Sequence, residues 1–190
     1  MNSLFAYLAK YGPVPAADQA FLIENATLRE VARHQVVLPA GSVCRHMYFL
    51  ESGLARFCYL KAGKDITTRF YGPGMPMTAL ASLLHREPSL YTLETVEPTR
   101  LYALSYEKLM RLLARSHAFE HISRLAALDI LLDNEKWLHT QRFQSAQERY
   151  ESFLTMYPAL APRVPLTHVA SYLGITLETL SRIRAATGRI

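Results

Sequence analysis

The 190-residue sequence predicts an α+β protein, with a β-rich first half flanked by short helices, then a long helix and a C-terminal helix-turn-helix. Three observations predict this fold. Short apolar runs separated by turn residues fill the first half, a helical apolar period begins at Ser105, and Gly174 separates two short amphipathic segments near the end. Because 50% of the residues are hydrophobic, the chain can bury a sizeable core.

The first half combines two short helices with a series of short strands. Residues 3–10 and 16–23 are predicted as helices that pack on the β unit, separated by Gly12 and two prolines. From Val31 to Leu104, apolar runs such as VVL, MYFL, LARFCYL and ITTRF recur about every ten to twelve residues, with glycine or proline turns between them. That spacing is typical of a β-sandwich or barrel.

A helical pattern extends from Ser105 to about Met156, and its central part is apolar on more than one face. One line of apolar residues is Ile122, Leu125 and Leu132, and another is Leu128, Leu131 and Leu138. A helix with two apolar faces needs two partners. We expect one face to pack on the β unit and the other on the same helix of a second subunit, giving a homodimer through residues 117–144. The alternative is a single buried helix inside a monomer.

Residues 166–185, LTHVASYLGITLETLSRIRA, have the pattern of a helix-turn-helix. Ala170 is small where the two helices would cross, and Gly174 stands where the first helix must stop. Thr176 is the expected N-cap of the second helix, with Glu178 in its first turn. The apolar seam between the helices would consist of Val169, Leu173, Ile175, Leu180 and Ile183. Because such a helix pair can place its second helix in the major groove, the pattern predicts a DNA-binding transcription regulator.

The predicted DNA-contacting residues share the exposed face and the ends of this motif. They are Thr167, Thr176, Leu177, Glu178, Thr179, Ser181, Arg182 and Arg184. Arg182 can donate two hydrogen bonds to guanine, and Glu178 can accept one from cytosine. Arg184 and Arg189 extend the positive charge, which favours contact with phosphates. The alternative is an ordinary packed helix pair with a solvated charged face.

Composition permits nucleic acid as a partner and points to the cytoplasm. The chain has 21 basic and 16 acidic side chains, a formal net charge of +5. Its two cysteines, Cys44 and Cys58, are too few for a disulfide framework or a four-cysteine cluster, so a reducing compartment and buried thiols are expected. No apolar run approaches a membrane span, and the N-terminus lacks a secretory pattern. We therefore expect a cytoplasmic protein with no cofactor and no membrane partner.

The order of these features resembles the CRP/FNR family of bacterial transcription regulators. The segment LPAGSVCRHMYFLESGLARFCYLKAGKDITTRFYGPGM is similar to the β-roll of that family, and VPLTHVASYLGITLETLSRIR is similar to its DNA-binding motif. Glu178, Thr179 and Arg182 fit the second helix of the family motif, whereas Leu177 replaces its first arginine. The preferred DNA sequence therefore stays open.

The resemblance implies three parts. Residues 1–116 would form a cyclic nucleotide-binding-like β-roll sensor domain, of the jelly-roll or double-stranded β-helix type. Residues 117–144 would be the long dimerisation helix, and residues 145–190 the helix-turn-helix domain. Ser145 and Glu148 have the spacing of a capping box, which begins a new helix there. Little room remains after the second helix for the strands of a wing.

The resemblance also implies a ligand pocket after the Pro-Gly turn at residues 73–74. Its expected lining is Tyr71, Met77, Thr78, Ala79, Leu80, Ser89, Leu90 and Tyr91. Cyclic-nucleotide binders of the family carry a glutamate for the ribose and an arginine for the phosphate, and an ungapped count puts Ala79 and Ser89 in those places. Without the arginine, a partly buried phosphate lacks a partner, so we expect no tight cyclic-AMP binding. His85 and Arg86 are nearby substitutes, and the effector, if there is one, is not identified.

Two other functions compete with this hypothesis. The stretch from Gly41 to Gly53, with His46 and Glu51, imitates half of a cupin metal motif, but Tyr48 replaces the second histidine. A first-row metal would have too few ligands, so we expect no metal site and no enzyme. The second competitor is a sensor or protein-interaction module whose degenerate helix-turn-helix does not bind DNA, which Leu177 favours. Steep loss of DNA affinity with salt would distinguish a DNA binder from it.

Overall fold

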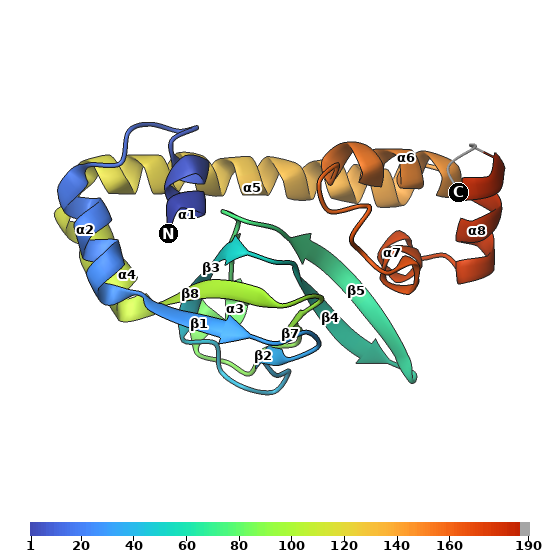
Figure 1. Cartoon of the computed structure of the whole chain (residues 1–190), viewed down its shortest axis with the longest axis horizontal. Coiled ribbons are helices and arrows are strands. Elements are labelled where there is room, and N and C mark those ends of the chain that lie inside the picture. The colour runs from blue at the N-terminus through green and yellow to red at the C-terminus, as the bar shows by residue number, and fades with distance from the viewer. Residues whose placement is uncertain (187–190) are drawn as a thin grey trace.

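The computed structural model describes residues 1–186 and confirms the predicted α+β architecture (Figure 1). Predicted residue Arg189 lies outside the described residues. The helix α5 (His117–Phe143) runs along one side of a β-roll, with the N-terminal helices at one end and the C-terminal helices at the other. The remaining helices are α1 (Asn2–Leu8), α2 (Ala16–Asn25), α3 (Leu80–His85), α4 (Tyr106–Arg115), α6 (Ala146–Met156), α7 (Leu166–Leu173) and α8 (Leu177–Ala186).

The β-roll consists of two four-stranded antiparallel sheets. The first has the order β1 (Thr27–Val31), β8 (Thr99–Ser105), β3 (His46–Ser52) and β6 (Pro76–Met77). The second has the order β2 (Val36–Leu38), β7 (Thr92–Thr95), β4 (Ala55–Lys61) and β5 (Lys64–Tyr71), so β5 is an edge strand. Fully buried Leu50, Leu93 and Leu101 contribute to the core between the sheets.

Gly53, in the turn between β3 and β4, is required by close packing of the backbone. Its φ is +100°, and a Cβ atom there would lie 2.7 Å from the Cα of Thr99. The turn residues predicted from sequence therefore include at least one position that no other residue fits.

The two N-terminal helices form where the sequence predicts them and pack with α4 and α5 on the outer side of the first sheet. Leu4, Leu22 and Leu104 are fully or almost fully buried in this second apolar cluster. The carboxylate of Glu51 accepts hydrogen bonds from the amides of Asn2 and Ser3 at the start of α1. Glu51 therefore acts as a hydrogen-bond acceptor at the N-terminus of a helix. This role accounts for an acidic residue here without a cupin-like metal motif.

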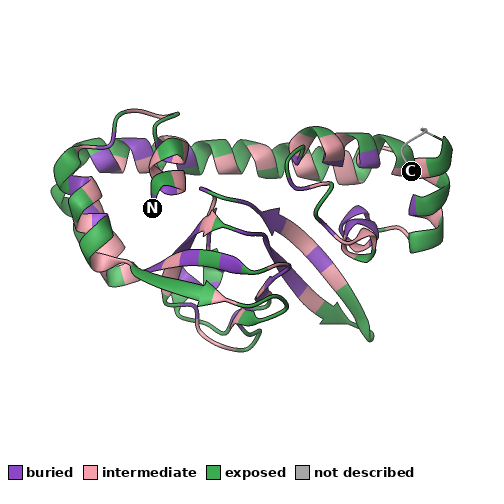
Figure 2. Cartoon of the chain, viewed as in Figure 1, coloured by how far each residue is buried: buried purple, intermediate pink, exposed green. Residues whose placement is uncertain are grey.

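The long helix α5 has one buried face and one exposed apolar face. Phe119, Ile122 and Ala126 are buried against the N-terminal helices and the β-roll. The exposed fractions are 47% for Leu128, 61% for Leu131, 52% for Leu132 and 50% for Leu138, and the middle of α5 is coloured as exposed or intermediate in Figure 2. The grouping of Leu132 with Ile122 was wrong. Ten residues of helix turn through about 1000°, which leaves Leu132 about 80° away from Ile122.

The C-terminal helices begin and end at sequence signals. The predicted capping box is confirmed, because Ser145 Oγ accepts from the Glu148 amide while Glu148 Oε2 accepts from the Ser145 amide at 2.7 Å. Helices α6 to α8 share a core with the second sheet, in which Leu54 and Phe70 of the β-roll are fully buried. Among the described residues, no helix is long and apolar enough to cross a membrane.

Candidate DNA interface and ligand pocket

Helices α7 and α8 form the predicted helix-turn-helix. Helix α7 ends at Gly174, whose φ of +68° lies in the left-handed region, and the Ile175 amide donates to the Ala170 carbonyl at 3.0 Å. Thr176 Oγ1 accepts a hydrogen bond from the Thr179 amide at 3.2 Å, so Thr176 is the N-cap that the sequence predicts. Fully buried Leu180 lies in the seam between the two helices. The second helix is therefore held at a fixed angle to the first.

The predicted DNA-contacting residues differ in exposure. Those that are exposed are Thr167, Thr176, Leu177, Glu178, Ser181 and Arg182. Thr179 and Arg184 are half-buried. The Thr179 hydroxyl lies 3.3 Å from Arg182 Nη2 and 3.2 Å from Thr176 Oγ1, so this residue supports its two neighbours. Six of the predicted side chains are thus accessible on one motif.

Glu178 is the acidic group of this surface. Hydrogen bonds from its own backbone amide and from the Thr176 side chain, with the Arg182 charge nearby, lower the pKa of the Glu178 carboxyl. The group is fully exposed and stays ionised at neutral pH. It can therefore act only as a hydrogen-bond acceptor there.

A cleft of about 350 Å³ lies between the β-roll and α5, and it brings together part of the predicted ligand pocket. Five of the predicted residues line it: Tyr71, Thr78, Ala79, Leu80 and Tyr91. Trp137 of α5 lines it from the opposite side. A second cleft, of about 790 Å³, shares some of these residues and extends toward α1 and α4.

The other three predicted pocket residues do not line this cleft. Met77 and Ser89 are buried, and Leu90 is exposed. The Ser89 hydroxyl donates to the carbonyl of Tyr91 at 2.7 Å, so the residue in the place of the phosphate-binding arginine closes a local turn. His85 and Arg86 are exposed and do not line either cleft.

Arg69 is the one cation lining the smaller cleft among the residues that the structure describes. Its Nη1 atom donates to Asn134 Oδ1 on α5 at 2.5 Å, and its guanidinium lies 5.9 Å from the centre of the Tyr71 ring. Asp133 on α5 lines the same cleft. The cleft therefore offers one positive and one negative group together with aromatic walls, a mixture that does not favour an anion alone.

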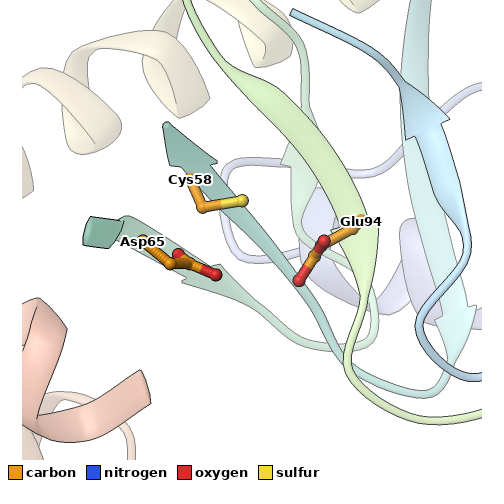
Figure 3. A group of neighbouring side chains, drawn as sticks. All are labelled: Cys58, Asp65 and Glu94. Atoms are coloured by element: carbon orange, nitrogen blue, oxygen red, sulfur yellow. The ribbon is translucent and has the colours of Figure 1, made fainter. Parts of the chain in front are cut away.

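A cluster of metal-ligand types on three neighbouring strands is an ion-pair network. Cys58, Asp65 and Glu94 lie around a common point (Figure 3), and their ligand atoms are within 4.8 Å of one another. The guanidinium of Arg56, only 2% exposed, binds both carboxylates and so supplies the positive charge of the cluster. Burial raises the pKa of the Cys58 thiol to about 11, so this sulfur is a neutral thiol. Cys44 is also buried and free.

Sequence reasoning missed the surface that joins the helix-turn-helix to the β-roll. Helix α7 packs against β5, and the Phe70 ring on β5 is 5.4 Å from the Tyr172 ring on α7. Phe153 and Tyr157 complete this aromatic cluster from α6 and the residue after it. The apolar run around Phe70 signals a strand, but nothing local indicates which helix covers it.

Comparison with known proteins agrees with this architecture. Residues 28–116 match the family model of the cyclic nucleotide-binding domain. The regulatory protein HlyX of Actinobacillus pleuropneumoniae is 24% identical over 170 residues, which cover 82% of this chain and 69% of HlyX.

Two solved structures share the fold. The c-di-GMP-responsive global regulator CLP of Xanthomonas campestris superposes with a TM-score of 0.70, at 17% identity, over 92% of each chain. A transcriptional regulator assigned to the crp/fnr family from Eubacterium rectale superposes with a TM-score of 0.69, at 16% identity, over 95% of this chain and 87% of that one.

The fold and the matched domain define a class of architecture: a cyclic nucleotide-binding-like β-roll joined by a long helix to a helix-turn-helix. The chain is similar in sequence to the regulatory protein HlyX and in fold to a regulator assigned to the crp/fnr family.

Proposed function

We propose that the chain is a dimeric, sequence-specific DNA-binding transcription regulator whose helix α8 enters the major groove. One observation carries the proposal: α8 exposes Glu178, Ser181 and Arg182 on one side while Leu180 on its other side is fully buried against α7. A helix that is rigidly backed and polar in front is suited to contact base edges. Helix α8 is accordingly called the recognition helix.

The residue types suggest a division of roles on the DNA. Arg182 donates to guanine O6 and N7, and Glu178 accepts from cytosine N4. Leu177 offers an apolar contact to a thymine methyl group, which is consistent with its position at the first turn. The hydroxyls of Thr167, Thr176 and Ser181 bind phosphates or bases, Thr179 supports Arg182, and Arg184 adds positive charge behind the recognition helix.

The exposed leucines of α5 support dimerisation through residues 117–144. Leu128, Leu131, Leu132 and Leu138 are each about half exposed or more, along a helix whose opposite face is already buried. A second copy related by a two-fold axis would cover this face with the same face of its own α5. Two recognition helices about 34 Å apart would then bind a palindrome. We accordingly divide the chain at residues 116 and 144, and place the protein in the cytoplasm with its DNA.

The clefts beside α5 are the proposed effector site, if the protein uses one. Tyr71, Thr78 and Leu80 line both clefts, next to the helix that carries the dimer face. Because Ala79 and Ser89 stand where cyclic-nucleotide binders have their charged pair, tight binding of cyclic AMP is not expected. Calorimetric titration with cyclic AMP tests this, and a dissociation constant in the micromolar range or lower would contradict it.

Selection from a random duplex library tests DNA binding directly. The wild-type protein and Arg182→Ala are carried through the same selection, with Arg111→Ala as a matched control, because Arg111 is an exposed arginine on α4. We expect a palindromic motif for the wild type and for Arg111→Ala. For Arg182→Ala we expect one base position to lose its preference, with a loss of about 1 to 3 kcal/mol on the preferred site.

Two results would oppose the proposal. No enriched motif for the wild type, with a shallow salt dependence, favours the protein-interaction module instead. Equal losses by Arg182→Ala on every sequence would make Arg182 a phosphate contact rather than a base contact.

A further inference from the structure

The free edge of strand β5 is occupied by one side chain of helix α7. Ser171 Oγ donates to the Asp65 carbonyl oxygen at 2.7 Å, and the Thr67 amide donates to the same Oγ at 2.9 Å. A residue of a neighbouring parallel strand would bond a carbonyl and an amide spaced in this way. The Ser171 hydroxyl therefore takes the place of a strand at the sheet edge. It joins the helix-turn-helix to the second sheet of the β-roll.

The same two residues of β5 are also held by the buried Arg56, whose side chain lies on the outer face of the second sheet, on the same side as Phe70. Its Nη1 atom donates to Asp65 Oδ1 at 2.8 Å and to Thr67 Oγ1 at 2.6 Å. Its Nε atom donates to Glu94 Oε1 on β7 at 2.8 Å. The backbone that Ser171 binds is thus fixed to the neighbouring strands β4 and β7, so it is a rigid anchor and not a mobile edge.

Aromatic packing beside this contact holds α7 against β5 but does not specify one position of the helix along the strand. The ring of Tyr172, next to Ser171, lies against Phe70 of β5 and against Phe153 and Tyr157. Apolar packing of this kind tolerates small shifts of a helix along a strand, because the hydrophobic effect is non-directional. A hydroxyl that donates to one carbonyl and accepts from one amide specifies a single register of the helix on the strand.

We propose that Ser171 is a positioning residue for DNA binding: its bonds to Asp65 and Thr67 fix α7, and with it the recognition helix, at one place relative to the β-roll. The position of α8 depends on that of α7, because Leu180 and the turn at Gly174 join the two helices. In a dimer built on α5, the register of α7 on β5 sets the distance and tilt between the two recognition helices. The inference rests on the proposed function.

The dependence of DNA affinity on half-site spacing distinguishes a positioning role of Ser171 from a general effect on protein stability. Duplexes carry the two half-sites selected by the wild type, separated by spacers of different length, and one further duplex carries a single half-site. Affinities are measured for the wild type, Ser171→Ala, Ser171→Thr and Ser152→Ala. Thr keeps the hydroxyl, and Ser152 is a matched control because its hydroxyl donates to the Gln144 side chain at the junction of α5 and α6 rather than to the backbone of β5.

The expected result is a change of spacing preference in one variant only. Ser171→Ala binds the single half-site as the wild type does, but loses roughly five- to tenfold in affinity at the preferred spacing and accepts other spacings more evenly. Ser171→Thr and Ser152→Ala keep the wild-type spacing profile. A general loss of folding would instead weaken every duplex alike.

Several outcomes would overturn the inference. An unchanged spacing profile in Ser171→Ala, equal losses on the single half-site and on the palindrome, or a loss in Ser171→Thr as large as in Ser171→Ala each contradict it. Failure of the wild type to bind any duplex overturns the proposed function itself, whereas wild-type binding with an unaltered Ser171→Ala variant overturns only the role of Ser171.

Discussion

The substitution Leu131→Asp is expected to break the dimer without unfolding the subunit. Leu131 is 61% exposed on α5, so a charged side chain there is compatible with the isolated chain. Complete burial of a leucine contributes about 2 kcal/mol, so covering the exposed part of Leu131 contributes about 1 kcal/mol in each subunit. Placing a carboxylate in that apolar interface costs at least about 1 kcal/mol more, and two-fold symmetry counts each effect twice. The two effects together amount to about 4 kcal/mol for the dimer, so its dissociation constant should rise roughly 1000-fold.

Sedimentation equilibrium measures this constant directly. Leu60→Asp is the matched control, because Leu60 is 79% exposed near the end of β4 and does not belong to α5. We expect the wild type and Leu60→Asp to form dimers of equal affinity, and Leu131→Asp to sediment as a monomer with an unchanged circular dichroism spectrum. A Leu131→Asp protein that dimerises as tightly as the wild type would refute the assignment of this face.

The remaining predictions concern the seam, one histidine and one thiol. Leu180→Ala should lower the free energy of unfolding by about 2 to 5 kcal/mol in urea denaturation, because the side chain is fully buried, whereas Leu177→Ala should change it by less than about 1 kcal/mol. Burial, and after it the charge of Arg56, lowers the pKa of His168, so the unfolded chain binds this proton more readily than the folded chain. The free energy of unfolding should therefore fall as the pH is lowered below about 6.5. His168→Gln should show a weaker dependence of this free energy on pH, and a dependence identical to that of the wild type would contradict the assignment. Since its pKa is raised to about 11 by burial, the Cys58 thiol should react with a thiol reagent far more slowly in the folded protein than in urea, and equal rates would contradict its burial.

The parts of the fold that sequence predicts best are those encoded locally. Gly174 can adopt the left-handed conformation that ends α7, and Thr176 caps the next helix with its own hydroxyl. The capping box of Ser145 and Glu148 depends on residues three positions apart. Each of these signals depends on a few neighbouring residues, so these particular helix boundaries follow from the sequence alone.

Contacts between distant segments are less accessible to such reasoning. Ser171 and Asp65 are 106 positions apart, and the hydroxyl of a serine on a helix gives no indication that it will meet a strand edge. The ligand pocket shows the same limit, since Ser89 and Leu90 were both expected to line it, but Ser89 is buried in a local turn and Leu90 is exposed. Those placements depend on how the strands curve and on which helix covers them. The period of apolar residues in the sequence indicates neither of these.

An equilibrium titration of the wild-type protein with its selected palindrome, at two salt concentrations, tests the central claim most directly. The account predicts two chains bound to each palindrome, with affinity falling at least about tenfold between about 50 and 200 mM salt as phosphate contacts are screened. Binding of one chain, or an affinity that does not depend on salt or on sequence, would contradict a dimeric DNA-binding regulator.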